Sequence, residues 1–170
     1  MRVALAVLAF VASASPAAAD PAADAAERWG LIGLWKLDCT KGPSREDPSF
    51  RYVVRGGKLY QERDSGGAKD ANIVSLAEAG ADRTLELTVI LPPPSPARTL
   101  VLRHEGSDRF SVRSNRAIGT DDYTIKDGRL PDGKPAYHWR WADGRTLSRR
   151  AWYRLNQETS LAADTQLESR

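Results

Sequence analysis

From residue 31 onward, apolar and polar residues alternate with a period of two, which predicts strands rather than helices. The segment 84–91, Thr-Leu-Glu-Leu-Thr-Val-Ile-Leu, is typical of a strand with one buried face. Short turn sequences rich in Gly and Asp separate further predicted strands. These strands cover residues 72–78, 98–104, 109–113 and 118–126. Strands of similar length without long helices between them predict an all-β domain, an antiparallel barrel of about 8–10 short strands.

A tight hairpin is predicted over residues 51–62. Two alternating segments, 51–55 and 58–62, flank Gly56 and Gly57, and a two-residue loop requires the positive φ angles that glycine adopts readily. Two other connections differ in character. Residues 40–49 form a long loop, and the proline-rich stretch 92–96 predicts a stiff, extended linker.

The most aromatic part of the chain, residues 137–155, is predicted to be a hairpin. A two-residue loop at 143–144 would mix apolar and polar side chains on both faces, whereas a three-residue loop at 142–144 separates them. With the longer loop, Tyr137, Trp139 and Trp141 share the apolar face, and His138 and Arg140 lie on the polar one. Burial favours this register.

In the same register Arg149 reaches the aromatic face, opposite Tyr137 and near Trp139. A guanidinium over aromatic rings has two interpretations: a structural cap that closes the barrel end, or a cation that receives an anionic headgroup. The cap is favoured, because such stacking is common in ordinary folds. The candidate ligand-binding residues are Trp35, Tyr137, Trp139, Trp141 and Arg149.

Residues 1–19 are interpreted as a Sec-type signal peptide, with Arg2, an apolar run over 3–12 and cleavage after Ala19. The expected location is therefore the bacterial periplasm or the exterior. About 150 residues remain, enough for one domain with a substantial core. We expect 20–30 to be a frayed lead-in or one short helix, 31–155 to be the barrel and 156–170 a polar tail. No later segment is apolar enough for a transmembrane helix.

Composition changes this picture little. The net charge of +3 and the sequence pI of about 9.2 reflect a small excess of arginine and do not indicate nucleic acid binding. Two histidines and one cysteine do not make a metal-ligand spacing, so no metal or cofactor is expected. Nucleophile-elbow and phosphate-loop motifs are missing, and Asp121-Asp122 fits a solvated turn. We expect no catalytic residues and no enzyme.

The one cysteine, Cys39, has three interpretations. On a strand that begins at Leu31, the side chains of Leu31, Trp35 and Cys39 would share the core face, which favours a buried thiol. A disulfide-linked homodimer is the second interpretation, since a single cysteine in an exported chain can pair between molecules. A catalytic thiol is the third, and it needs a base that only His104 or His138 could supply.

Gly33-Leu34-Trp35 resembles the Gly-x-Trp motif on the first strand of lipocalin-like (calycin) barrels. Residues 120–123, Thr-Asp-Asp-Tyr, are loosely similar to the family's Thr-Asp-Tyr motif with one extra residue. The resemblance implies that Arg149 or Arg154, on the last strand, corresponds to the family's arginine that packs over the first-strand tryptophan. The resemblance implies an eight-stranded up-and-down barrel with a small-ligand cavity. The Trp-x-x-Asp-Cys stretch at 35–39 is also similar to small secreted proteins of alphaproteobacteria.

The leading functional hypothesis is an exported, non-enzymatic protein that binds a small hydrophobic or amphiphilic ligand in the barrel. The alternative is a ligand-free envelope or interaction module. Its basic face, formed by His138, Arg140 and Arg150, would contact an anionic partner.

Overall fold

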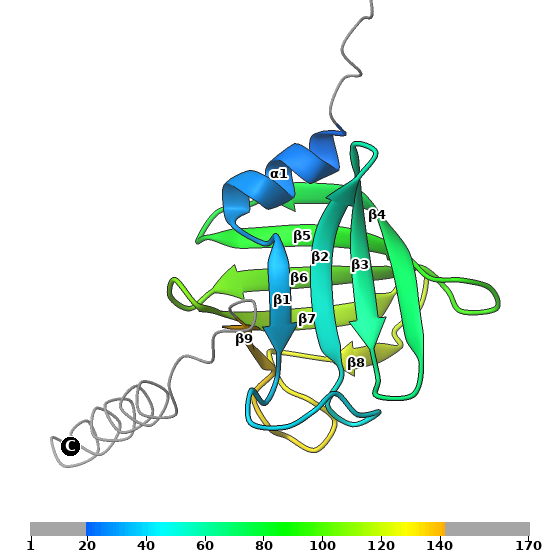
Figure 1. The fold of residues 1–170 in the computed structure, drawn as a ribbon, viewed down its shortest axis with the longest axis vertical. Coiled ribbons are helices and arrows are strands. Elements are labelled where there is room, and N and C mark those ends of the chain that lie inside the picture. Colours follow the sequence, from blue (N-terminus) through cyan, green and yellow to red (C-terminus); the bar gives the residue numbers. More distant parts are fainter. Residues whose placement is uncertain (1–19, 142–170) are drawn as a thin grey trace, which may run out of the picture.

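The computed structural model describes residues 20–141, and these form one helix and nine strands (Figure 1). The elements are α1 (Pro21–Trp29), β1 (Gly33–Lys36), β2 (Ser49–Arg55), β3 (Lys58–Asp64), β4 (Lys69–Ala79), β5 (Thr84–Ile90), β6 (Arg98–His104), β7 (Arg109–Ala117), β8 (Tyr123–Ile125) and β9 (Tyr137–Trp141). The predicted signal peptide, the second half of the C-terminal hairpin and the polar tail lie outside the described residues.

The strands close into an antiparallel barrel. Strands β1 to β7 pair in chain order, and β9 then joins β7 to β1, so that eight strands form a ring. The short strand β8 pairs with β7 outside that ring. The all-β antiparallel barrel predicted from the alternation is therefore confirmed. Closure leaves no open edge among the eight ring strands, which removes the usual route to edge-to-edge association.

The predicted β2–β3 hairpin is confirmed in its register. Arg55 pairs with Lys58, and the two residues between them, Gly56 and Gly57, have φ angles of +56° and +77°. Positive φ at both central positions gives a turn whose twist matches that of the flanking strands. The glycine pair thus sets the pairing of the whole hairpin.

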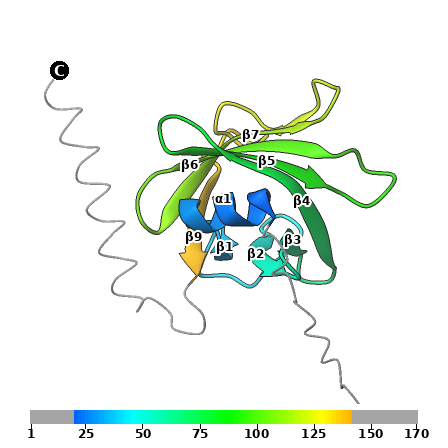
Figure 2. The same cartoon turned by 90° about the horizontal axis from the view of Figure 1, so that it is seen from above.

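Helix α1 lies across one end of the barrel (Figures 1 and 2). Its start follows from local sequence: the Asp20 carboxylate accepts a hydrogen bond of 2.9 Å from the Ala22 N–H, and Pro21 occupies the first turn. It ends at Gly30, which adopts a left-handed φ of +80°. The buried side chains of the helix are four alanines, Ala22, Ala23, Ala25 and Ala26. Their small size lets the helix approach the strand ends closely. For residues 20–30 the sequence left two alternatives, a frayed lead-in or a short helix, and the structure has the short helix.

The barrel core beneath α1 is apolar and closely packed. Trp35 is fully buried, its indole N–H donates a 2.7 Å hydrogen bond to the Leu31 carbonyl, and its ring lies 4.6 Å from that of Phe110. Leu59 and Leu102 on other strands are also fully buried. Burying aliphatic side chains of this size stabilises a fold by roughly 1.5–3 kcal/mol each.

Several predicted boundaries are wrong. Strand β1 ends at Lys36, so Cys39 lies in the turn that follows and not on the core face of a strand. Strand β7 runs on to Ala117, and β8 covers only three residues of the predicted 118–126 strand. The proline-rich stretch 92–96 is not an extended linker. It reverses the chain between β5 and β6, with Ser95 N–H bonded to the Pro92 carbonyl at 3.1 Å, because adjacent antiparallel strands need a return connection.

The faces of β9 are opposite to the predicted ones. His138 is 5 % exposed and points into the barrel, whereas Tyr137, Trp139 and Trp141 are partly exposed on the outside. Pairing with β1 explains this, because Arg140 lies opposite the inward-pointing Trp35. Side chains opposite each other in a sheet share a face, so a neighbouring strand, not the hairpin loop, sets the orientation.

Candidate functional site

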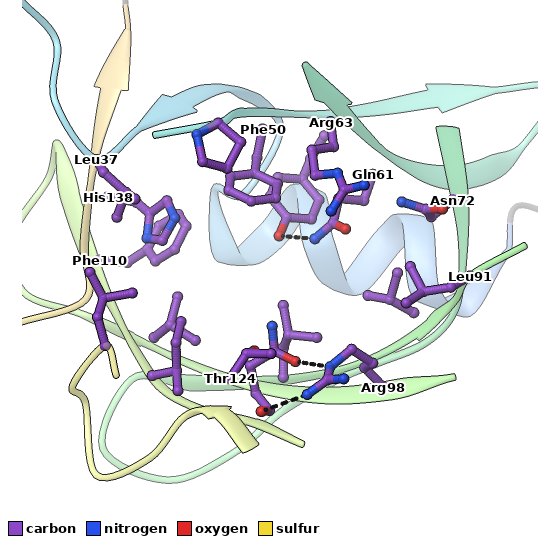
Figure 3. Close-up of a pocket in the computed structure, with 18 of the residues that line it drawn as sticks. Leu37, Phe50, Gln61, Arg63, Asn72, Leu91, Arg98, Phe110, Thr124 and His138 are labelled. Atoms are coloured by element: carbon purple, nitrogen blue, oxygen red, sulfur yellow. Dashed lines mark hydrogen bonds between the residues drawn. The ribbon is translucent and has the colours of Figure 1, made fainter. Parts of the chain in front are cut away.

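The end of the barrel away from α1 contains a cavity of about 350 Å³ (Figure 3). Strands β2 to β7 and β9 supply most of its wall, and the loops after β1 and around β8 complete the rim. Cavities that bind small molecules begin at about this volume. Its lining consists mostly of aromatic and aliphatic side chains, with a small number of polar groups among them.

A row of polar side chains crosses three neighbouring strands of the wall. Tyr52 on β2 pairs with Gln61 on β3, and Gln61 pairs with Asn72 on β4. All three are buried, with exposed fractions of 2–5 %. The Gln61 amide Nε2 donates a 2.8 Å hydrogen bond to the Tyr52 hydroxyl, and burial raises the pKa of Tyr52 to about 12. The phenol is therefore neutral at physiological pH.

A chain of polar contacts runs from the rim to Asn72. Arg63 forms an ion pair of 2.7 Å with Asp70, and the second Asp70 oxygen accepts a 3.2 Å hydrogen bond from Asn72 Nδ2. An ionised carboxylate only accepts hydrogen bonds, so it fixes which end of the Asn72 amide faces it. The Asn72 carbonyl oxygen has no hydrogen-bond partner within residues 20–141.

The other arginine of the cavity wall, Arg98, is fully engaged by its neighbours. Its Nε donates a 2.6 Å hydrogen bond to the Asn115 side chain, and its guanidinium forms a 3.2 Å ion pair with Asp122. Asp122 belongs to the turn that the sequence predicted to be solvated, and it is indeed exposed. The positive charge of Arg98 is thus compensated within the protein.

An aromatic cluster lines another part of the wall, among aliphatic side chains. The His138 ring stacks on Phe110, with centroids 5.1 Å apart and planes 13° apart, and meets Phe50 edge-on at 5.5 Å. Burial lowers the pKa of His138 to about 4, although the Ala136 backbone carbonyl partly opposes this effect. Figure 3 shows His138 and Phe110 on one side of the cavity, with Gln61 and Asn72 on the other.

The four sequence-predicted site residues within the described part of the chain, Trp35, Tyr137, Trp139 and Trp141, do not line this cavity. Trp35 is buried in the barrel but does not line the cavity; the Arg140 guanidinium lies 4.8 Å from its ring centroid and donates to the Gly30 carbonyl. An arginine therefore does cover the first-strand tryptophan, and it comes from β9. Arg149 and Arg154, the two predicted candidates, lie outside the described residues.

The three β9 aromatics contact cationic side chains on the outer face of the sheet, where Lys36 is itself buried. The Arg109 guanidinium lies 4.7 Å from the ring centroids of both Tyr137 and Trp139, and Lys36 Nζ lies 4.7 Å from that of Trp141. These contacts resemble the predicted cap in chemistry, but Arg109 on β7 provides the guanidinium. They hold β9 against both of its neighbours in the ring.

Sequence reasoning missed Gln61 and Asn72, although a signal for both was present, and it placed His138 on the outer face instead of in the cavity. Leu59 and Val74 are inward residues, and the period of two places Gln61 and Asn72 on the same inward face. A polar residue at an apolar-phase position is an informative observation in a strand. His138 could not be found in this way, because its phase depends on pairing with β1.

The remaining candidates form no chemical constellation. Cys39 is half-buried in a turn, and burial raises the pKa of its thiol above the ordinary value, so the reactive thiolate is disfavoured. His104 stacks on Trp29 at 3.8 Å and contacts the Trp29 carbonyl through Nε2 at 2.6 Å, which ties the end of α1 to β6. Among residues 20–141, no group of three His, Cys, Asp or Glu side chains is placed to hold a metal ion.

The fold and the site together define a closed eight-stranded antiparallel barrel, covered by a helix at one end and hollow at the other. Comparison with protein-family models, curated proteins and solved structures gave no match. Within the described part of the chain, α1 is the one helix, and it is too short to cross a membrane.

Proposed function

We propose that this protein is an exported, non-enzymatic barrel that binds a small hydrophobic or amphiphilic molecule in its cavity. The observation that carries the proposal is the divided wall, with buried hydrogen-bonding groups around Gln61 on one side and the rings around His138 on the other. A solid barrel would fill this volume with side chains, because protein interiors normally leave few voids larger than a water molecule. The export part rests on the signal-peptide pattern of residues 1–19.

The interaction module remains the second candidate, and the structure weakens it. The sequence places His138 and Arg140 on its basic outer face. In the structure His138 points into the barrel and Arg140 packs over Trp35. Arg150, its third member, lies outside the described residues. Two of the three side chains assigned to the anionic partner are therefore turned away from it.

The binding proposal can be tested with the neutral dye N-phenyl-1-naphthylamine, whose fluorescence rises in apolar surroundings. Wild-type protein should enhance the dye saturably, and Leu100→Trp should abolish the enhancement, because Leu100 lines the cavity and the larger side chain fills it. The matched control is Val101→Trp, because Val101 is the next residue on the same strand and points outward. This variant should enhance the dye as the wild-type protein does. Equal enhancement by all three proteins would place the dye on the surface and refute cavity binding.

A second measurement searches for the natural ligand. The mass of protein purified from the periplasm under native conditions should exceed the denatured mass by that of one small molecule. The same comparison on Leu100→Trp should show no difference.

A further inference from the structure

We propose that the cavity selects an uncharged, flat molecule, aromatic or conjugated, that carries one small hydrogen-bonding group such as a hydroxyl or an amide. The hydrogen-bonding group lies at the Tyr52–Gln61 pair, and the flat part lies against Phe50, Phe110 and His138. This inference rests on the proposed function and specifies its ligand class.

The buried polar groups of the wall are neutral. Tyr52, Gln61 and Asn72 are a phenol and two carboxamides, and His138 is unprotonated at physiological pH because it is buried. A carboxamide and a phenol offer both donors and acceptors, so the Tyr52–Gln61 pair can meet a hydroxyl or an amide in either sense. The wall also has unmet capacity, since the Asn72 carbonyl oxygen has no partner in the described part of the chain.

Each charged side chain that lines the cavity is either paired with an opposite charge of the protein or exposed to solvent. Arg63 is paired with Asp70, and Arg98 with Asp122. Glu46 is exposed at the rim. An ion that entered the cavity would lose its hydration without gaining a free counter-charge, and burying an unpaired charge is strongly unfavourable. The cavity therefore discriminates against both carboxylates and ammonium groups.

The aromatic side gives the ligand its shape. His138 and Phe110 lie nearly parallel, with Phe50 tilted by 63° to His138, so this part of the wall presents ring faces and edges, beside aliphatic side chains such as Leu100 and Val112. Offset stacking and edge contacts with such rings favour a planar partner. A volume of about 350 Å³ admits a molecule of two or three fused rings more readily than a long-chain lipid.

Four naphthalene derivatives of nearly equal size test the inference by isothermal titration calorimetry at pH 7.5. They are 2-naphthol, 2-naphthoate, 2-naphthylmethylammonium and 2-methylnaphthalene. We expect 2-naphthol to bind at least about tenfold more tightly than either ion and several-fold more tightly than 2-methylnaphthalene.

Two substitutions at Gln61 assign the preference to the polar row. Gln61→Leu should reduce 2-naphthol affinity to that of 2-methylnaphthalene, and Gln61→Glu should make the ammonium compound the tightest of the four, because it supplies the missing counter-charge. Gln61→Met serves if the leucine variant does not fold. The control is Glu62→Leu on the outward face of the same strand, which should leave the wild-type order unchanged.

The outcomes separate the two proposals. Tightest binding of 2-naphthoate, or an unchanged order in Gln61→Glu, would overturn the uncharged-ligand inference while leaving cavity binding intact. If none of the four compounds binds and the dye also fails to bind, both the inference and the proposed function are wrong.

Discussion

The buried His138 makes a quantitative prediction about stability in mild acid. Burial lowers its pKa from 6.5 to about 4 in the folded protein, whereas the unfolded chain keeps the ordinary value. The unfolded state therefore binds a proton first as the pH falls, and the folded state loses stability. The contribution is complete above pH 6.5 and is lost progressively between pH 6.5 and pH 4.

The magnitude follows from the size of the shift. Each pKa unit corresponds to about 1.4 kcal/mol, so the whole shift amounts to about 3 kcal/mol, of which about 2 kcal/mol is already lost at pH 5. A loss of this size is a large part of the stability of a small domain. The expected result is a clear fall in the urea midpoint between pH 7 and pH 5.

The matched variant is His138→Phe, which keeps an aromatic ring between Phe110 and Phe50 but cannot titrate. Its free energy of unfolding at pH 7 should lie within about 1.5 kcal/mol of the wild-type value, because the swap nearly conserves volume. Other groups with shifted pKa values, such as Asp38 and Asp47, are shared by both proteins and cancel in the difference. Urea unfolding at pH 7, 6 and 5 measures that difference. A wild-type-minus-variant difference that stays constant over this range would refute the assignment of a buried, neutral imidazole.

Three further predictions concern other contacts. Arg140→Ala should lower the free energy of unfolding by about 2 kcal/mol, because it removes the stacking on Trp35 and the hydrogen bond to the Gly30 carbonyl, and an unchanged urea midpoint would contradict this. Gly57→Ala should cost about 1 kcal/mol through its φ of +77°, measured by thermal unfolding, and a stabilised variant would exclude the two-residue turn. Cys39 should react with Ellman's reagent more slowly than free cysteine, because burial raises the pKa of its thiol; fast reaction, or a dimer band without reductant, would show that it is accessible.

The sequence was sufficient for features that depend on local chemistry. The alternation of 84–91 reappears as β5, and the glycine pair at 56–57 defines the β2–β3 turn without any tertiary information. The first helix also had a local signal, since Asp20 and Pro21 are typical of a helix start and Gly30 of a helix end. Such features are determined by backbone preference, which each residue carries with it.

Features that depend on distant pairing were not accessible in the same way. The predicted faces of β9 came from its own hairpin loop, and the prediction failed because β1, more than a hundred residues earlier in the chain, places Arg140 opposite Trp35. A one-residue difference in phase exchanges the two faces completely. Because of the same error, Tyr137, Trp139 and Trp141 were expected at the binding site although they lie on the outer face of β9, and His138, which lines the cavity, was expected on the outside.

The two barrel ends have different contacts, and this difference supports ligand entry at the end away from α1. At the α1 end, Arg140 on β9 donates to the Gly30 carbonyl and His104 on β6 stacks on Trp29. The helix is therefore joined to β6 and β9, the two neighbours of β7 in the ring. At the other end, the side chains over the cavity include Arg63 and Glu46, both exposed and held by contacts near the surface. Exposed contacts of this kind contribute little to stability, so the rim is held less firmly than the α1 end. A molecule can therefore reach the polar row past the rim without disturbing the packed core around Trp35.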